Sequence, residues 1–124
     1  MSKVPDRYRG TTKNVHVLGE LVRAAQYRGA TTYQDIALIM GLPPKELHIS
    51  REIGWILGEI AEDEVKAGRP MLSAVADSVK GKPGPGFFDL ARQLGELGEA
   101  KDEQAFWRKE RDAAYEAWNR PLPE

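Results

Sequence analysis

The sequence predicts one mainly helical domain with a small β component, a winged helix-turn-helix-like domain with two added C-terminal helices. Apolar residues recur at three-to-four spacing in three successive segments, which is typical of amphipathic helices. A glycine-containing turn separates the second segment from the third, as in helix-turn-helix pairs. A glycine- and proline-rich stretch over 81–86 comes after a short β-rich run, where a wing would lie.

The N-terminal residues differ in character from the rest of the chain. Residues 1–13 are polar and lack periodicity, so we expect a flexible basic arm. A first helix is expected over 14–28, with Asn14 as its N-cap and Gly29 as its end.

The next two helices form the expected helix-turn-helix pair. The second covers 34–40, and a capping box could be formed either by Thr31 with Gln34 or by Thr32 with Asp35. The third covers roughly 46–67 and contains Gly54 and Gly58. Because glycine costs about 1 kcal/mol in a helix interior relative to alanine, we expect another backbone to pack closely there.

The remaining elements complete a winged-helix-like domain over 14–95. A strand is expected over 71–79 and a short helix over 87–94. Residues 96–124 then form a C-terminal helical extension that packs on the domain, with a helix from Asp102 to about Asn119. Its aromatic residues recur at helical spacing and are expected in the core: Trp107, Tyr115 and Trp118.

Composition excludes several classes of protein. A hydrophobic fraction of 41% is too high for a disordered chain. The chain has no cysteine, which excludes disulfides and thiolate chemistry and fits a reducing compartment. No apolar run approaches the roughly 20 residues that span a bilayer, and no secretory signal is visible. We therefore expect a cytoplasmic protein without a membrane partner.

Charge is unevenly distributed despite a net charge of −1. Residues 1–30 hold six basic and two acidic groups, so a polyanion would be met there. The third helix is acidic, with Glu59, Glu62, Asp63 and Glu64, and we interpret this run as a solvated face. No spacing of ligand residues predicts a metal site, and no motif predicts a nucleophile or a cofactor.

Three motifs carry a resemblance to a known family. They are GATTYQDIA over 29–37, MGLP over 40–43 and REIG over 51–54. They resemble the DNA-binding C-terminal domain of the O6-alkylguanine-DNA alkyltransferases and the alkyltransferase-like proteins, over about residues 14–88. The resemblance implies that Tyr33 lies beside the phosphate of the target nucleotide. It also implies that Arg51, on the recognition helix, fills the space of a flipped base and offsets part of the lost stacking.

The reactive motif of that family is missing. Residues 70–75 fall where the family has P-C-H-R-V-V, but Met71 replaces the nucleophilic cysteine, Leu72 the histidine and Ser73 the arginine. A thioether cannot supply a thiolate, so alkyl transfer is excluded and we expect no enzymatic activity. A looser resemblance over 68–75, 83–88 and 106–110, to small bacterial or phage proteins, implies no activity.

The leading hypothesis is therefore a non-catalytic protein that binds double-stranded DNA, related to alkyltransferase-like DNA repair or defence proteins. We expect recognition at the start of the third helix, phosphate contacts from the wing, and sequence-independent affinity from the arm. The expected DNA-binding residues are Tyr33, His48, Ser50, Arg51, Lys80, Lys82, Arg7, Arg9 and Lys13. The alternative is a protein-protein interaction module that has lost DNA binding, with a protein partner or as a homodimer.

Overall fold

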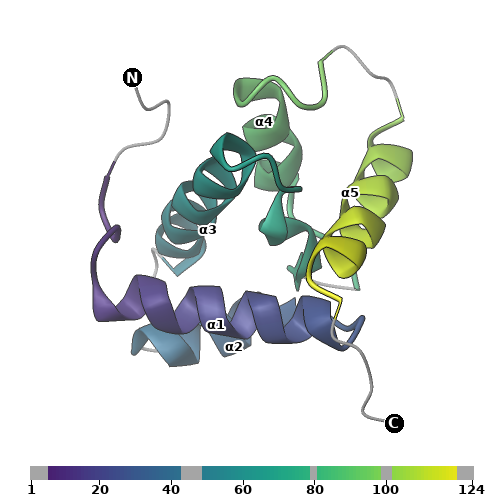
Figure 1. The fold of residues 1–124 in the computed structure, drawn as a ribbon. Coiled ribbons are helices and arrows are strands. Elements are labelled where there is room, and N and C mark those ends of the chain that lie inside the picture. Colours follow the sequence, from purple (N-terminus) through teal and green to yellow (C-terminus); the bar gives the residue numbers. More distant parts are fainter. Residues whose placement is uncertain (1–5, 43–48, 79–80, 99–101, 120–124) are drawn as a thin grey trace, which may run out of the picture.

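The computed structural model describes residues 6–42, 49–78, 81–98 and 102–119. The fold is mainly helical with a small two-stranded parallel sheet (Figure 1). The sequence-based expectation of that composition is confirmed. In chain order the elements are α1 (Thr12–Gln26), β1 (Thr31–Thr32), α2 (Tyr33–Met40), α3 (Ile49–Lys66), the 3-10 helix η1 (Leu72–Val75), β2 (Ala76–Asp77), α4 (Pro85–Gln93) and α5 (Glu103–Ala117).

Side-chain caps determine where three helices begin. The Thr32 hydroxyl accepts a hydrogen bond from the Asp35 amide at 3.1 Å, as the capping pattern predicts. At α1 the cap is Thr11, which accepts from the amide of Asn14, so the expectation that Asn14 caps this helix is wrong. Asp102 caps α5 in the same way.

The expected strand over 71–79 is mostly wrong. Leu72–Val75 forms a turn of 3-10 helix, and only Ala76–Asp77 is extended. Ala76 pairs in parallel with Thr31, and Asp77 with Thr32. All four residues of η1 are buried, so packing rather than alternation explains the apolar run.

The core has two clusters that meet at α3 and η1. The first contains apolar residues of α1, α2 and α3, and the second joins the C-terminal half of α3 to α4 and α5. Trp107 is buried and donates from Nε1 to the Ala74 carbonyl at 2.9 Å. Tyr115 donates to the Gly29 carbonyl at 2.8 Å, and Trp118 packs against the first cluster. The prediction that these aromatic residues belong to the core is confirmed for Trp107, whereas Tyr115 and Trp118 are only partly buried and pack against it.

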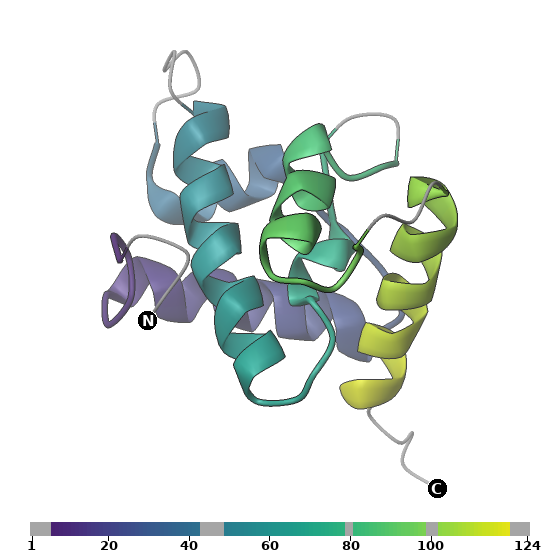
Figure 2. The same cartoon turned by 90° about the horizontal axis from the view of Figure 1, so that it is seen from above.

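The helix α3 lies between two neighbours. Residues 6–11 run along one side of it, and α4 lies on the other (Figure 2). Within the described ranges, no helix combines the length and apolar character needed to cross a bilayer.

Candidate nucleic-acid interface

A cleft of about 450 Å³ lies among α3, α4 and the start of α2. Three aromatic side chains line it, from three different elements: Tyr33, Trp55 and Phe87. Three hydroxyl side chains do so as well: Ser50, Ser73 and Ser78. A concave site with mostly apolar walls and a few polar groups is the usual form of a small-molecule or base-binding site.

Two glycines of α3 keep this cleft open. Gly54 and Gly58 both line it. A Cβ atom built on Gly54 would meet no atom within 4 Å, so no backbone packs closely there. The expectation of a close helix contact at Gly54 is therefore wrong, and the missing side chain leaves space in the cleft instead.

Ser73 contributes an unusual polar group to the wall. Its side chain is 4% exposed, and among the described residues its hydroxyl has no hydrogen-bond partner. A buried polar group left unpaired costs about 1–3 kcal/mol. Nothing in the sequence alone marked Ser73 as a cleft residue.

Met71, which the sequence-based resemblance aligned with a reactive cysteine, is not among the residues that line the cleft. It is completely buried in the second core cluster. Its amide donates to Glu110 Oε2 at 2.9 Å, which ties this segment to α5. Position 71 is thus a core position.

Tyr33 begins α2 and forms the wall opposite α3. Its phenolic oxygen lies close to Gly84: a Cβ atom added to Gly84 would lie 3.2 Å from this oxygen. Burial raises the pKa of Tyr33, so the hydroxyl stays protonated at neutral pH. It can therefore donate a hydrogen bond to an acceptor in the cleft.

The start of α3 presents exposed polar residues beside the cleft. Ser50 and Arg51 are exposed, and the Arg51 guanidinium lies 5.2 Å from the centre of the Trp55 ring. The Arg7 guanidinium lies 4.0 Å from the centre of the same ring. The structure thus brings Tyr33, Ser50, Arg51 and Arg7 to one region, as the predicted interface requires.

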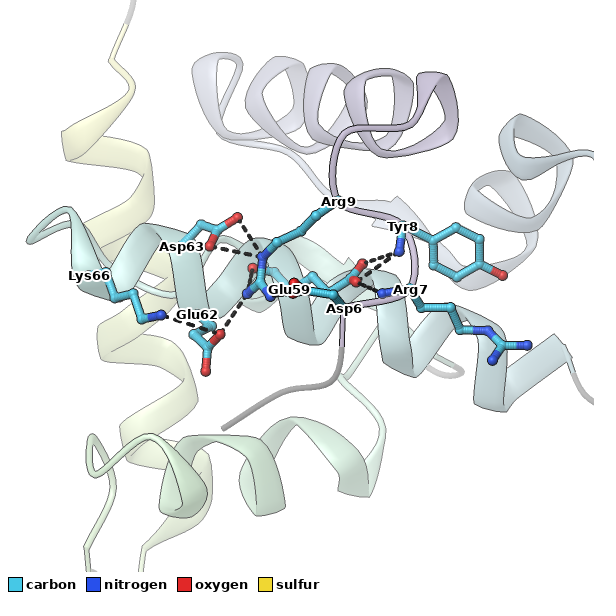
Figure 3. A network of polar contacts seen from close by, with 8 residues as sticks. All are labelled: Asp6, Arg7, Tyr8, Arg9, Glu59, Glu62, Asp63 and Lys66. Carbon is cyan, nitrogen blue, oxygen red and sulfur yellow. Dashed lines mark hydrogen bonds and ion pairs between the residues drawn. The ribbon is translucent and has the colours of Figure 1, made fainter. Parts of the chain in front are cut away.

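The described part of the arm is bound to the acidic residues of α3 (Figure 3). The buried Glu59 carboxylate accepts from the amides of Arg7 and Tyr8. Arg9 donates to Glu62 at 2.6 Å and to Asp63 at 3.2 Å.

The sequence-based interpretation of these acids as a solvated face is wrong for Glu59, Glu62 and Glu64, which are buried. Glu64 has its own counter-ion, because Arg69 donates to it at 2.6 and 3.1 Å. Sequence analysis missed the arm contacts because they join residues more than fifty positions apart. The only signal was the opposite charge of the two segments.

The other predicted DNA contacts lie elsewhere. Lys13 is exposed in the first turn of α1, and Lys82 is exposed in the turn before α4. His48 and Lys80 lie outside the described residues. In the parts of the chain that the structure describes, no group of three or more histidine or carboxylate side chains is placed to hold a metal ion.

No protein-family model matches the chain, and neither a curated protein nor a solved structure matches it.

Proposed function

We propose that this protein is a non-catalytic, winged-helix-like domain that binds double-stranded DNA and takes an unpaired or extruded base into its cleft. In this proposal α2 and α3 are the helix-turn-helix pair, and the turn before α4 is the wing. We propose that the domain is related to the alkyltransferase-like DNA repair or defence proteins. The observation that supports it best is the aromatic cleft beside the exposed first turn of α3.

The chemistry of the cleft suits a nucleobase. Stacking of a base on an aromatic side chain is worth about 1–3 kcal/mol, and the cleft offers Tyr33, Trp55 and Phe87. Extrusion of a base costs a few kcal/mol, and least for a mismatched or damaged base. The serine hydroxyls supply hydrogen bonds to the polar edge of a ring. Such a site recognises a base without any reaction, which agrees with a core methionine at position 71.

The N-terminal end of α3 suits a phosphate backbone. The amides and the dipole at the N-terminal end of a helix favour anions. Arg51 adds a positive charge at this end and forms no ion pair with any residue that the structure describes. We propose that Ser50, Arg51, Tyr33 and Lys82 contact the duplex, whereas Arg9 serves the fold.

Fluorescence anisotropy with short labelled duplexes tests this function. The duplexes are one fully paired, one with a single mismatch and one with an alkylated guanine, each at several salt concentrations. We expect a negative slope of log K against log salt, tighter binding of the mismatched or alkylated duplex, and weaker binding by Arg51→Ala. Arg108→Ala, an exposed arginine of α5, is the matched control. No binding at low salt, or a slope of zero, contradicts the proposal.

A second candidate, a protein-interaction module, is favoured by three exposed apolar side chains. Val15 and Tyr27 are each 62% exposed, and Leu38 is 68% exposed. Sedimentation equilibrium tests the homodimer form of this candidate, with Leu38→Lys as the variant that should dissociate it.

A further inference from the structure

We infer that Arg7 and Arg51 form one phosphate-binding fork on the Trp55 ring, which receives the phosphate of the nucleotide whose base enters the cleft. The inference rests on the proposed function and extends it to the N-terminal arm. It makes Arg7 a ligand-binding residue fixed by the fold, rather than one charge on a free polycation.

The two guanidinium groups converge on one indole. Arg7 lies 4.0 Å and Arg51 lies 5.2 Å from the ring centre, and Trp55 itself lines the cleft. An arginine beside an aromatic face is attracted to the ring electrostatically. Neither arginine lines the cleft itself, and Trp55 is the residue that joins both cations to it.

The fork keeps unused donors and a net positive charge. Arg7 binds Glu52 through Nε and Nη2, at 3.2 and 3.3 Å. The Arg7 side chain also interacts with the Tyr8 side chain, so the unused donors of the fork are those of Arg51, whose guanidinium makes no ion pair with the described residues. One carboxylate thus faces two guanidinium groups, and a phosphate would supply the missing negative charge. Guanidinium groups also match phosphate oxygens in geometry.

The arm holds Arg7 in place before any ligand arrives. The Tyr8 hydroxyl donates to Glu52 at 2.5 Å, and the amides of Arg7 and Tyr8 donate to Glu59. Arg9 anchors the same segment through its hydrogen bond to Glu62. A fork that is ordered in advance loses little entropy on binding.

A ring-binding cleft beside a phosphate fork indicates a nucleotide rather than a simple anion. The buried Ser73 hydroxyl in the cleft wall has no hydrogen-bond partner among the described residues, so a polar atom of a bound ring could pair with it. The nucleotide has two possible sources, a unit of a nucleic-acid strand or a free nucleoside monophosphate.

The chain contains a matched control for the fork. Arg69 also binds a carboxylate through Nε and Nη2, that of Glu64, and also lies over a tryptophan, at 5.4 Å from the centre of the Trp118 ring. Trp118 does not line the cleft. Arg69→Gln therefore removes the same kind of contact without touching the proposed site.

The experiment monitors the indole N–H signals of the three tryptophans by NMR, with the Trp55 signal assigned through Trp55→Phe. The four deoxynucleoside 5′-monophosphates and their parent nucleosides are titrated in turn. We expect the monophosphates to shift the Trp55 signal and to bind about tenfold more tightly than the nucleosides. Arg7→Gln and Arg51→Gln should each remove most of this advantage, while Arg69→Gln should retain it. Thermal unfolding shows whether each variant is folded.

The same variants are then tested with the labelled duplexes. If only duplexes bind, and Arg7→Gln weakens that binding, the fork holds a phosphate of a strand. If duplexes bind Arg7→Gln as tightly as wild type, or if nucleosides bind as tightly as monophosphates, the fork is wrong and the proposed function stands. If neither duplexes nor monophosphates bind, both proposals are wrong.

Discussion

Arg9 donates from Nη2 to a carboxylate oxygen of Glu62 at 2.6 Å, across 53 positions of the sequence. The Glu62 side chain is 3% exposed, so this contact neutralises a charge that water cannot reach. Without Arg9 the buried carboxylate loses the ion pair at 2.6 Å and keeps the longer one to Lys66, whose Nζ lies 3.7 Å from Glu62 Oε1. We expect Arg9→Ala to lower the free energy of unfolding by about 2–4 kcal/mol in urea titrations.

Two further variants test the cause of this loss. Arg108→Ala removes an exposed arginine and should change the stability by less than about 0.5 kcal/mol. Glu62→Gln combined with Arg9→Ala should recover part of the loss, because the buried charge is then absent. An Arg9→Ala protein as stable as wild type would show that the ion pairs of Arg9 contribute nothing to the stability.

Gly54→Ala separates stability from ligand binding. The added methyl group meets no atom within 4 Å and replaces glycine inside a helix, so the free energy of unfolding should rise by about 0.5–1 kcal/mol. Gly19→Ala in α1 has the same free space and is the control. Gly54→Leu should also fill the cleft and weaken duplex binding, which Gly19→Leu should not. Equal binding by both leucine variants would mean that the cleft is not used.

Glu110→Gln should change how stability depends on pH. Burial raises the pKa of Glu110 above its ordinary value of 4.5, although the Met71 amide opposes this. Well below pH 4.5 the side chain is neutral in both the folded and the unfolded state, so its burial does not lower the free energy of unfolding. As the pH rises above that value, the folded state binds the proton more tightly, so wild type loses stability. The glutamine keeps an acceptor for Met71 and carries no charge.

The measurement compares the free energy of unfolding of wild type and Glu110→Gln between about pH 4 and pH 8. As the pH rises, the free energy of unfolding of Glu110→Gln should increase relative to that of wild type. A difference that does not change with pH would refute the role given to burial.

A thiol placed at position 71 should be unreactive. Met71 is completely buried, and only an accessible thiolate reacts. Because the chain has no cysteine of its own, Met71→Cys and Ser50→Cys give single-thiol proteins. With a thiol-specific reagent, Ser50→Cys should be labelled quickly and Met71→Cys only as fast as the protein unfolds. Equal labelling rates would show that position 71 opens to the cleft.

The helices are predictable from sequence because their signals are local. Apolar spacing and caps such as Thr32 lie within one segment, so the sequence alone places α2 close to its observed bounds. Where a competing cap lies nearby, as with Thr11 and Asn14, the predicted start of the helix is displaced by two residues. The apolar run at 71–79 is ambiguous because a buried 3-10 turn and a buried strand have the same composition.

The cleft and the arm contacts are not predictable because they depend on which segments meet. Gly54 indicates either a close helix contact or an open space, and only the neighbouring α4 decides between them. From the sequence, Glu59 cannot be distinguished from a solvent-facing glutamate, because the two amides that bind it belong to the distant arm. Trp55 lines the cleft together with residues of α2 and α4 and contacts Arg7, all of which lie far from it in the sequence.

The pairing of Thr31 with Ala76 bears on folding kinetics. This two-residue ladder closes a loop that contains the whole of α2 and α3, so it gains its hydrogen bonds only after a large loss of chain entropy. We expect α1 and α2 to associate early, with the ladder and the polypeptide beyond it joining in the rate-limiting step. Truncation before β2 should therefore leave a collapsed helical intermediate and not a smaller native protein.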